Sequence, residues 1–475
     1  MTPQIEKAVF RLPDSSWCEA ELAGMELADG RLRRRAVESL QRLSQHPTAS
    51  IPEACGEWSA TKGVYGLFKH QTVNHQVLLA PHREQTIGRM LAHERVLAVQ
   101  DTCYLNLSHF ESMEGIGSIG TEKQGLRGLV MHTTVAITEQ GVNLGVLHQQ
   151  VWARPEREEK GDGGKKADPP IEEKESYKWL AALAQTPKLA QTEVVTVCDA
   201  EADVYELLAL AVETEKNLLV RAGQDRALMP PEVGLIRRAV GAGEVCAQLT
   251  LNLSATEKEA ARQATVSVYY KKVKLRPPQR PTRADRAPLP PLVIWAVQLR
   301  EMQPPPGATP VDWLLLTTVP VRSAQDALQR SAWYCLRWQI EIWHKILKSG
   351  CRIEHRRLKT ADRLLSCLAL YDMIAWRLHW LTHLARHDPA APCTTALTPA
   401  EWQALYAHAT GGTDLPAEPP SMAQVVLWVA QLGGFLARKG DGYPGVTVLW
   451  RGWRRLQDLV SMWTLFHPLP AMGKT

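Results

Sequence analysis

From about residue 76 to residue 375, short runs of β-branched and apolar residues alternate with stretches of helical periodicity. The predicted strands lie at 96–99, 128–137, 142–151, 194–197 and 217–221, and the predicted helices between them at 177–185 and 202–213. Strands that alternate with helices pack as layers of an α/β structure. We therefore expect a mixed sheet flanked by helices in this part of the chain.

Residues from about 225 to 312 interrupt the alternation. Three further strands are predicted there, at 245–253, 264–273 and 292–299, and a Pro- and Arg-rich loop joins them. A strand at 313–319 then resumes the core, and a long helix follows from about 324 to 349. We expect three domains: a helical one at 1–75, an α/β one at 76–375 with a β insertion at about 225–312, and a helical one at 376–475 that is rich in Trp and Leu.

The composition is that of an ordinary globular protein. The 475 residues are 45% hydrophobic, which is enough for several domains with a sizeable core. No apolar stretch approaches the ~20 residues of a membrane helix, and no signal peptide is evident, so we expect a cytoplasmic protein with no membrane partner. The nine cysteines form no CxxC pair, so the sequence gives no indication of a zinc ribbon.

The net charge of +5 is small, but the basic residues are clustered. The clusters lie at 31–35, 270–286, 345–359 and 451–455. Local basic stripes can neutralise phosphates even when the whole chain is nearly balanced in charge. Each cluster is equally compatible with a solvated charged face.

Two predicted strands each end in an aspartate, at Asp101 and Asp199. A carboxylate at the end of a strand faces the crevice where open α/β sheets place functional groups, and two of them could hold a divalent metal. The alternative is that each Asp begins a turn or caps a helix. Glu201 and Asp203 lie close to Asp199, and these acids could instead complement a helix dipole.

The long predicted helix carries a row of polar residues. Tyr334, Arg337, Glu341 and Lys348 stand at i, i+3, i+7 and i+14, which places them within an arc of roughly 60° at ~100° per residue. One face would then carry a phenol, a guanidinium, a carboxylate and an ammonium group. The alternative is a solvated stripe with an Arg337–Glu341 salt bridge.

The order strand-Asp, strand-Asp and helix-Glu after an insertion resembles that of RNase H-like polynucleotidyl transferases. The segment YCLRWQIEIWHKILK resembles the YREK signature of the IS-four family of bacterial cut-and-paste transposases, and it is most similar to the Tn-five type. VQDTCYLNLS and VCDAEADVYELL resemble the two Asp motifs of that family. LADGRLRRRAVESLQRL resembles its DNA end-binding domain, and LGGFLARKGDGYPGVTVLWRGW its dimerisation region.

The resemblance implies a DDE transposase that acts on double-stranded DNA as a synaptic homodimer. It implies metal-dependent nicking at the element ends, formation and opening of a hairpin, and transfer of the 3′-OH ends into target DNA. Asp101, Asp199 and Glu341 would hold two Mg²⁺ ions, for which Mn²⁺ could substitute, in a two-metal phosphoryl transfer.

The resemblance also assigns DNA contacts. Tyr334, Arg337 and Lys348 would position phosphates, with Lys345 and Arg221 as further contacts. Trp313 and Trp338 would stack on a flipped base. The candidates for end recognition are Arg31, Arg34, Arg35 and Lys62. Leu32 and Ala200 depart from the basic residues of the best-known relative, which bears on the end sequence that is recognised.

Other interpretations remain. His379, His383 and His387 are spaced as zinc ligands on a helix could be, but the HExxH motif is absent and Trp380 suggests a structural helix, so we expect no zinc. The chain could bind DNA without catalysis, although all the carboxylates are intact. It could also be a hydrolase with paired carboxylates for a substrate such as a sugar, although sugars offer no phosphates to the basic helix face.

Overall fold

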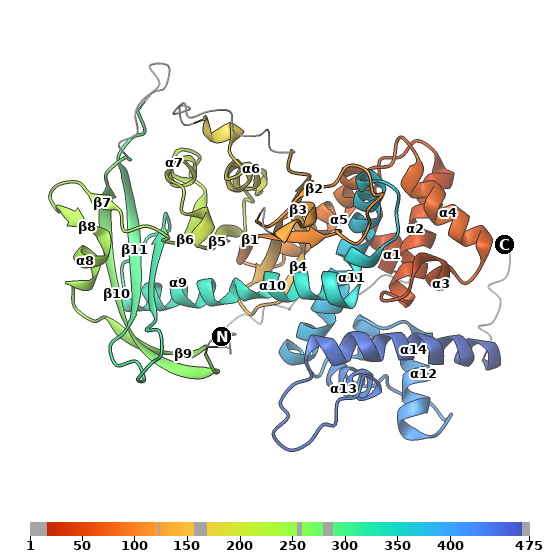
Figure 1. Cartoon of the computed structure of the whole chain (residues 1–475). Helices are drawn as coiled ribbons and strands as arrows, with labels where there is room; N and C mark the ends of the chain where they lie inside the picture. Colours follow the sequence, from red (N-terminus) through yellow and green to blue (C-terminus); the bar gives the residue numbers. More distant parts are fainter. Residues whose placement is uncertain (1–16, 122–123, 156–168, 254–258, 279–287, 468–475) are drawn as a thin grey trace.

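The computed structural model describes residues 17–121, 124–155, 169–253, 259–278 and 288–467. In these ranges, twelve strands form one sheet in the order β2-β3-β1-β5-β6-β12-β11-β10-β7-β8, with β4 beside β3 and β9 beside β10. Figure 1 shows this sheet across the upper and left parts of the molecule, with helical regions at the right and below. The predicted α/β fold with helical flanking regions is confirmed.

The centre of the sheet is mixed in direction. Its strands are β1 (Arg95–Asn106), β2 (Gly117–Ser118), β3 (Arg127–Thr138), β4 (Asn143–Trp152), β5 (Glu193–Cys198), β6 (Asn217–Arg221) and β12 (Asp312–Thr317). β1, β3 and β4 are antiparallel, whereas β5 pairs in parallel with both β1 and β6. Because a parallel pair needs a crossover, helix α6 (Tyr177–Gln185) lies between β4 and β5 in the chain, and α7 (Tyr205–Glu213) between β5 and β6.

The predicted β insertion is present, but its strands extend the same sheet. It contains β7 (Ala227–Leu228), β8 (Gly234–Leu235), β9 (Ala247–Leu253), β10 (Arg262–Leu275) and β11 (Leu292–Glu301), and also helix α8 (Ile236–Gly241), which the sequence reading missed. β11 pairs with β12 from Trp295 to Arg300, and this pairing joins the insertion to the core.

Alternating side chains bury both faces of the sheet, as a strand period of two requires. On β12, Leu314 and Leu316 pack with α6 and α7, whereas Leu315 faces the core shared with the helices on the other side. Those helices include α9 (Ala324–Leu336), α10 (Trp338–Lys345) and α11 (Ala361–His387), and Figure 1 shows α9 and α10 running along the sheet.

The long helix expected at 324–349 differs from the prediction in its second half. It is divided at Arg337, which keeps helical angles (φ −52°, ψ −33°). The segment Ile346–Gly350 is then a π-helical turn. Such a turn widens the helix, so side chains beyond Lys345 no longer follow the 100° step on which the predicted polar face rested.

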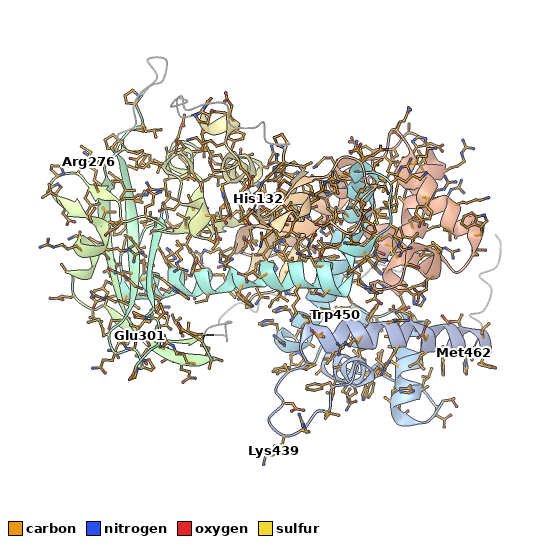
Figure 2. All side chains as sticks on the ribbon, in the orientation of Figure 1. His132, Arg276, Glu301, Lys439, Trp450 and Met462 are labelled. Carbon is orange, nitrogen blue, oxygen red and sulfur yellow. The ribbon has the colours of Figure 1, made fainter. Side chains whose placement is uncertain are left out.

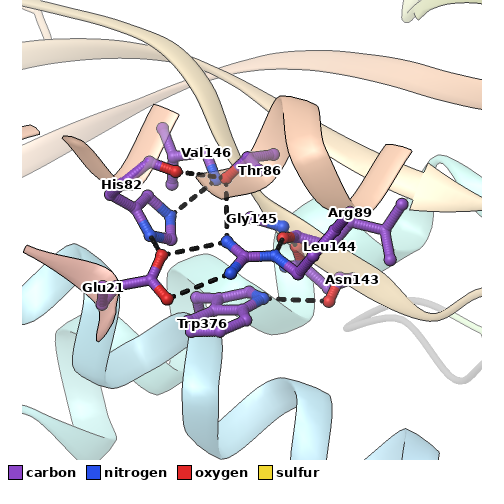
Figure 3. Close-up of polar contacts among 9 residues, drawn as sticks. All are labelled: Glu21, His82, Thr86, Arg89, Asn143, Leu144, Gly145, Val146 and Trp376. Atoms are coloured by element: carbon purple, nitrogen blue, oxygen red, sulfur yellow. Dashed lines mark hydrogen bonds and ion pairs between the residues drawn. The ribbon is translucent and has the colours of Figure 1, made fainter. Parts of the chain in front are cut away.

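The N-terminal region consists of α1 (Trp17–Glu21), α2 (Gly30–Gln45), α3 (Ile51–Cys55) and α4 (Trp58–Lys69), followed by α5 (His75–Met90). A buried polar network fixes it to the core (Figure 3). Glu21 accepts hydrogen bonds from both terminal nitrogens of Arg89 at 3.0 Å and from His82 Nδ1 at 2.5 Å. His82 Nε2 accepts from the backbone N–H of Val146 on β4, so α1, α5 and the sheet are held together.

The C-terminal region contains the end of α11, then α12 (Pro399–Thr410), α13 (Met422–Leu432) and α14 (Val446–Phe466). Residue 375 lies inside α11, so the chain continues through that position as one helix. Trp450 of α14 packs on Gly350 at the end of the π-helical turn, where Figure 2 shows it between α14 and the core. None of the described helices is long and apolar enough to cross a membrane.

Candidate active site

Asp101 lies within β1 rather than at its end, which corrects the expectation from the sequence. β1 pairs with β5 only as far as Val99, but its pairing with β3 continues to Asn106. The strand therefore continues with one free edge beyond the point where β5 ends. Asp101 stands on this edge, and its Oδ1 accepts a hydrogen bond from the Thr102 N–H at 2.9 Å.

Asp199 follows the last residue of β5, as the sequence predicted. Its Oδ1 accepts from the Glu201 N–H at 2.9 Å and caps the short 3-10 turn Ala200–Ala202. The other acids of this motif have structural partners: Glu201 is 3.7 Å from Lys178, and buried Asp203 bonds Arg226 at 2.5 Å and accepts from two backbone N–H groups. Of the acids in this motif, Asp199 is thus the one that faces the crevice with Asp101.

Glu341 comes to the same place from α10, which packs on β1. Arg337 Nη2 donates to Glu341 Oε1 at 2.6 Å, and Arg337 Nη1 is 4.0 Å from Asp101 Oδ2. The predicted Arg337–Glu341 pair is therefore present. This ion pair is half-buried, and its Arg337 also faces the carboxylate of Asp101, so the polar face of the helix is not simply exposed to solvent.

The charges of the three acids are coupled. Burial raises the pKa of Asp101 to about 7; Arg337 opposes this rise, and the carboxylates of Asp199 and Glu341 add to it. The carboxylate form of Asp101 is disfavoured first because the group is buried, and further because like charges face it across the crevice. A divalent cation would relieve this repulsion, and carboxylate oxygens are the ligands that Mg²⁺ prefers.

The described residues contain no group of three His, Cys, Asp or Glu side chains close enough to hold a metal ion as they stand. Two nitrogens of the Arg337 guanidinium face Asp101 and Glu341, so the guanidinium lies between these carboxylates. The donor set suits a divalent metal in its chemistry, and in this structure the Arg337 guanidinium occupies the position between two of the carboxylates.

Aromatic and basic side chains border the carboxylates. The ring of Trp313 on β12 packs edge-on against buried Tyr334 with centroids 5.4 Å apart, and the guanidinium of Arg221 lies 5.7 Å from the Trp313 ring. Burial raises the pKa of the Tyr334 hydroxyl, so it stays protonated and can donate a hydrogen bond. Trp338 is 51% exposed beside Arg337, and Lys345 is exposed on the same helix.

Lys348 is placed differently from the prediction, because it lies in the π-helical turn. Its Nζ donates to the carbonyl oxygen of Tyr104 at 2.9 Å and pairs with Glu354 at 3.1 Å. Tyr104 is three residues beyond Asp101 on β1. The structure therefore brings Tyr334, Arg337 and Glu341 together with Asp101 and Asp199. Lys348 lies further along β1, beside Tyr104.

The four residues predicted for end recognition are exposed on two packed helices. Arg31, Arg34 and Arg35 lie on α2, and Lys62 lies on α4. The sequence reading missed Trp58, which is 67% exposed at the start of α4, with Lys62 Nζ 5.3 Å from the centroid of its ring. A signal for it was available, since it is an aromatic residue followed by the small and polar residues Ser59, Ala60 and Thr61 in the first turn of the helix.

The three histidines that were considered as zinc ligands lie on α11. His379 bonds Asn143 and Gln339, each at 3.1 Å, and its ring contacts that of His383. His383 in turn stacks on His387 at 6.0 Å. Burial lowers the pKa of His379 well below its usual value and that of His383 to about 4, so both rings are neutral side chains within the helix packing.

An RNase H-like sheet with carboxylates on β1, after β5 and on the following long helix is the arrangement of a DDE transposase. Residues 180–375 match the family model of the transposase DDE domain, and residues 14–73 match that of transposase DNA-binding. Residues 373–463 match the transposase Tn5 dimerisation domain. The chain therefore belongs to the DDE transposases of the Tn5 type.

The three matches lie in the order expected from the sequence, and each corresponds to a part of the structure. The DNA-binding match covers α1 to α4, the DDE match covers the sheet from β5 and the helices α9 and α10, and the dimerisation match covers α12 to α14. The protein is thus a DNA transposase that binds DNA, forms dimers and depends on a divalent metal.

Proposed function

We propose that this transposase moves its element by a cut-and-paste route and belongs to the IS-four family. Asp101, Asp199 and Glu341 carry the phosphoryl transfers. The observation that supports this assignment is geometric: the acids come from different elements, and the Arg337 guanidinium reaches Glu341 Oε1 at 2.6 Å and Asp101 Oδ2 at 4.0 Å. Burial, with Asp199 and Glu341 adding to it, raises the pKa of Asp101. Groups that act as one site show such pKa shifts, although structural ion pairs show them as well.

In this proposal, two Mg²⁺ ions held by the three carboxylates would activate the attacking oxygen and stabilise the leaving one, and Mn²⁺ could replace them. Water first attacks the phosphorus at the element end, the P–O3′ bond breaks and a 3′-OH is released. That hydroxyl then attacks a phosphorus of the opposite strand, the P–O3′ bond there breaks, and the flanking DNA leaves with a 3′-OH as the hairpin closes. A second water attacks the phosphorus at the hairpin and releases the 3′-OH of the element again. This 3′-OH attacks a phosphorus of the target DNA and displaces a 3′-OH of the target strand.

The protein side chains hold the DNA for these steps. Arg337 is the side chain that must move, because its guanidinium now lies between Asp101 and Glu341. A phosphate offers two oxygens to the terminal nitrogens of the Arg337 guanidinium. An incoming DNA strand can therefore draw Arg337 away and free the carboxylates of Asp101 and Glu341. Tyr334 and Arg221 would contact the next phosphates, and Lys348 and Lys345 would contact the strand further along.

Two tryptophans are suited to the base that a hairpin forces out of the helix. Trp338 is 51% exposed beside Arg337, and the Trp313 ring lies 5.4 Å from that of Tyr334 and 5.7 Å from the Arg221 guanidinium. Stacking of a base on an aromatic ring contributes ~1–3 kcal/mol, which offsets part of the cost of unstacking.

A basic hollow beside the site extends the proposed path of the DNA. It has a volume of about 880 Å³ and lies between the α2–α3 turn and the segments after β1 and after the π-helical turn. Arg352, Arg357 and Lys359 line it together with His109 and His355. Glu354, which precedes His355 in the chain, pairs with Lys348 and accepts a hydrogen bond from the Asn106 N–H at the end of β1 at 2.7 Å.

We assign the parts of the chain as follows. Residues 1–75 bind the element end through Arg31, Arg34, Arg35 and Lys62, residues 76–375 cut and join DNA, and residues 376–475 pair two copies in the synaptic complex. The synaptic homodimer would act at the nucleoid in the bacterial cytoplasm.

The test is incubation of the purified protein with a duplex that carries its own element end, with Mg²⁺ or with EDTA. A denaturing gel should show a Mg²⁺-dependent nick that precedes a hairpin-sized product. Specific binding without strand cleavage in either Mg²⁺ or Mn²⁺ would contradict the proposal and identify a DNA-binding protein without catalysis.

A further inference from the structure

His344 is a buried polar residue beside the candidate site that the steps above do not use. It lies on α10, three residues after Glu341 and seven after Arg337, and so on the same face of the helix. Its side chain is 8% exposed, and its Nδ1 is 3.7 Å from Asp101 Oδ2. Its Nε2 is buried and has no hydrogen-bond partner among the described residues.

The two ring nitrogens of His344 have different surroundings. Nδ1 faces the carboxylate oxygen Asp101 Oδ2, whereas Nε2 has no partner among the described residues. An imidazole carries an N–H on at least one nitrogen, and a nitrogen that faces a carboxylate is the one that holds it. The hydrogen of His344 is therefore best placed on Nδ1.

The other oxygen of Asp101 already has a donor, since Oδ1 accepts from the Thr102 N–H at 2.9 Å. We propose that His344 is a positioning residue for Asp101: its Nδ1–H holds Oδ2 while the backbone holds Oδ1, and the plane of the carboxylate is thereby fixed. This inference rests on the proposed role of Asp101 as a metal ligand. Donors behind a ligating carboxylate orient it and so strengthen metal binding.

The present separation is longer than a hydrogen bond by ~0.7 Å, and a small rotation of the Asp101 side chain closes it. Arg337 now attracts the same oxygen, at 4.0 Å. When Arg337 moves to a phosphate, His344 becomes the donor nearest to Oδ2. The two residues therefore act on Oδ2 in succession, one before DNA enters the site and one after.

Two amide variants separate this role from simple packing. In His344→Asn the amide nitrogen stands near the place of Nδ1, whereas in His344→Gln it stands near the place of Nε2. His344→Leu fills a similar volume with no donor. If the ring only fills space, Leu and Gln should serve at least as well as Asn.

The measurement is binding of Mn²⁺, followed by electron paramagnetic resonance, to the full chain on a pre-cut end duplex. The Mn²⁺ concentration at half-saturation should rise ~10–100-fold in His344→Leu and His344→Gln and stay within ~3-fold of wild type in His344→Asn. Thermal unfolding without metal reports on folding separately. If His344→Leu does not fold, the comparison of Asn with Gln still decides the question.

Equal Mn²⁺ binding by all variants would overturn the inference, and so would rescue by Gln rather than Asn. Asp101→Asn is measured beside them, because it separates an error in the role of His344 from an error in the proposed metal site. If Asp101→Asn loses Mn²⁺ and the His344 variants do not, the role of His344 is wrong and the proposed site stands. If Asp101→Asn binds Mn²⁺ as wild type does, the metal site itself is misplaced, and the inference fails with it.

Discussion

Trp338 combines an exposed ring with a position directly beside Arg337, and this suggests a role in hairpin formation but not in the first nick. Trp338→Ala should lower the rate of hairpin formation ~5–150-fold, because ~1–3 kcal/mol of stacking is lost, and it should leave nicking unchanged. The ratio of hairpin to nicked product on a denaturing gel measures this. Trp58→Ala removes another exposed ring and should not change the ratio. An unchanged ratio in Trp338→Ala would show that the flipped base stacks elsewhere.

Asp372 is a fully buried carboxyl on α11 with an incomplete set of partners. Its Oδ1 accepts from Gln149 at 3.3 Å, and its Oδ2 has no hydrogen-bond partner within the described structure. Burial raises the pKa of Asp372, and the contacts with His75 and Gln149 only partly oppose this. A carboxyl with a raised pKa binds its proton more tightly in the folded than in the unfolded state, so its contribution to stability decreases as pH rises from about 4 through the folded pKa.

The difference in unfolding free energy between Asp372→Asn and wild type should therefore shift in favour of the variant as the pH rises from 5 to 8. Urea unfolding at the two pH values measures the difference, with Glu111→Gln on the surface as the control. A gap between Asp372→Asn and wild type that is the same at both pH values would show that Asp372 is ionised in the folded protein throughout this range.

At the scale of elements, α13 and α14 approach each other so closely that only glycine fits at the contact. A Cβ on Gly452 would lie 1.7 Å from the carbonyl oxygen of Val429, and a Cβ on Gly433 would lie 1.8 Å from that of Val448. Gly452→Ala should lower the free energy of unfolding by ~1–3 kcal/mol, because two helix backbones must separate. Gly88→Ala on α5 meets open space and should instead stabilise by ~0.5–1 kcal/mol. Equal stability of the two variants would mean that the helices are not packed this closely.

At the scale of the whole molecule, the network of Glu21, His82 and Arg89 holds the N-terminal helices on the catalytic sheet (Figure 3). Arg89→Met leaves a buried carboxylate without its guanidinium and should cost ~3–5 kcal/mol. The exposed pair Arg438–Asp441 is the control, and Arg438→Met should change stability by less than ~1 kcal/mol. Equilibrium unfolding measures both. If Arg89→Met is as stable as Arg438→Met, the N-terminal helices are held mainly by apolar contacts.

Local patterns predicted most of the elements, and the differences arise where distant parts of the chain meet. The run that ends at Asp199 is a strand because its β-branched residues are buried between two neighbours. The continuation of β1 past Asp101 depends on pairing with β3, a contact with a distant segment that the residues after Asp101 do not reveal. The insertion joins the main sheet through β11 and β12, and such a long-range pairing leaves no periodic signal.

The candidate site shows the same division. Tyr334, Arg337 and Glu341 share a helix face that a regular 100° step predicts correctly. Lys348 does not lie on this face as predicted, because the π-helical turn that begins at Ile346 changes the step per residue. The sequence also did not predict that His344 lies close to Asp101, because this proximity depends on how α10 packs against β1.

The central claim is that Asp101, Asp199 and Glu341 together cleave DNA, and single substitutions test it most directly. Cleavage and binding of the end duplex would be measured for Asp101→Asn, Asp199→Asn and Glu341→Gln, with Glu201→Gln as a control, since Glu201 is exposed and close to Asp199 in the chain. Each of the three variants should lose cleavage ~10³-fold or more, because several kcal/mol of transition-state stabilisation disappear, and should bind DNA within ~3-fold of wild type. Glu201→Gln should cleave normally. Cleavage at the wild-type rate by any of the three would contradict the account.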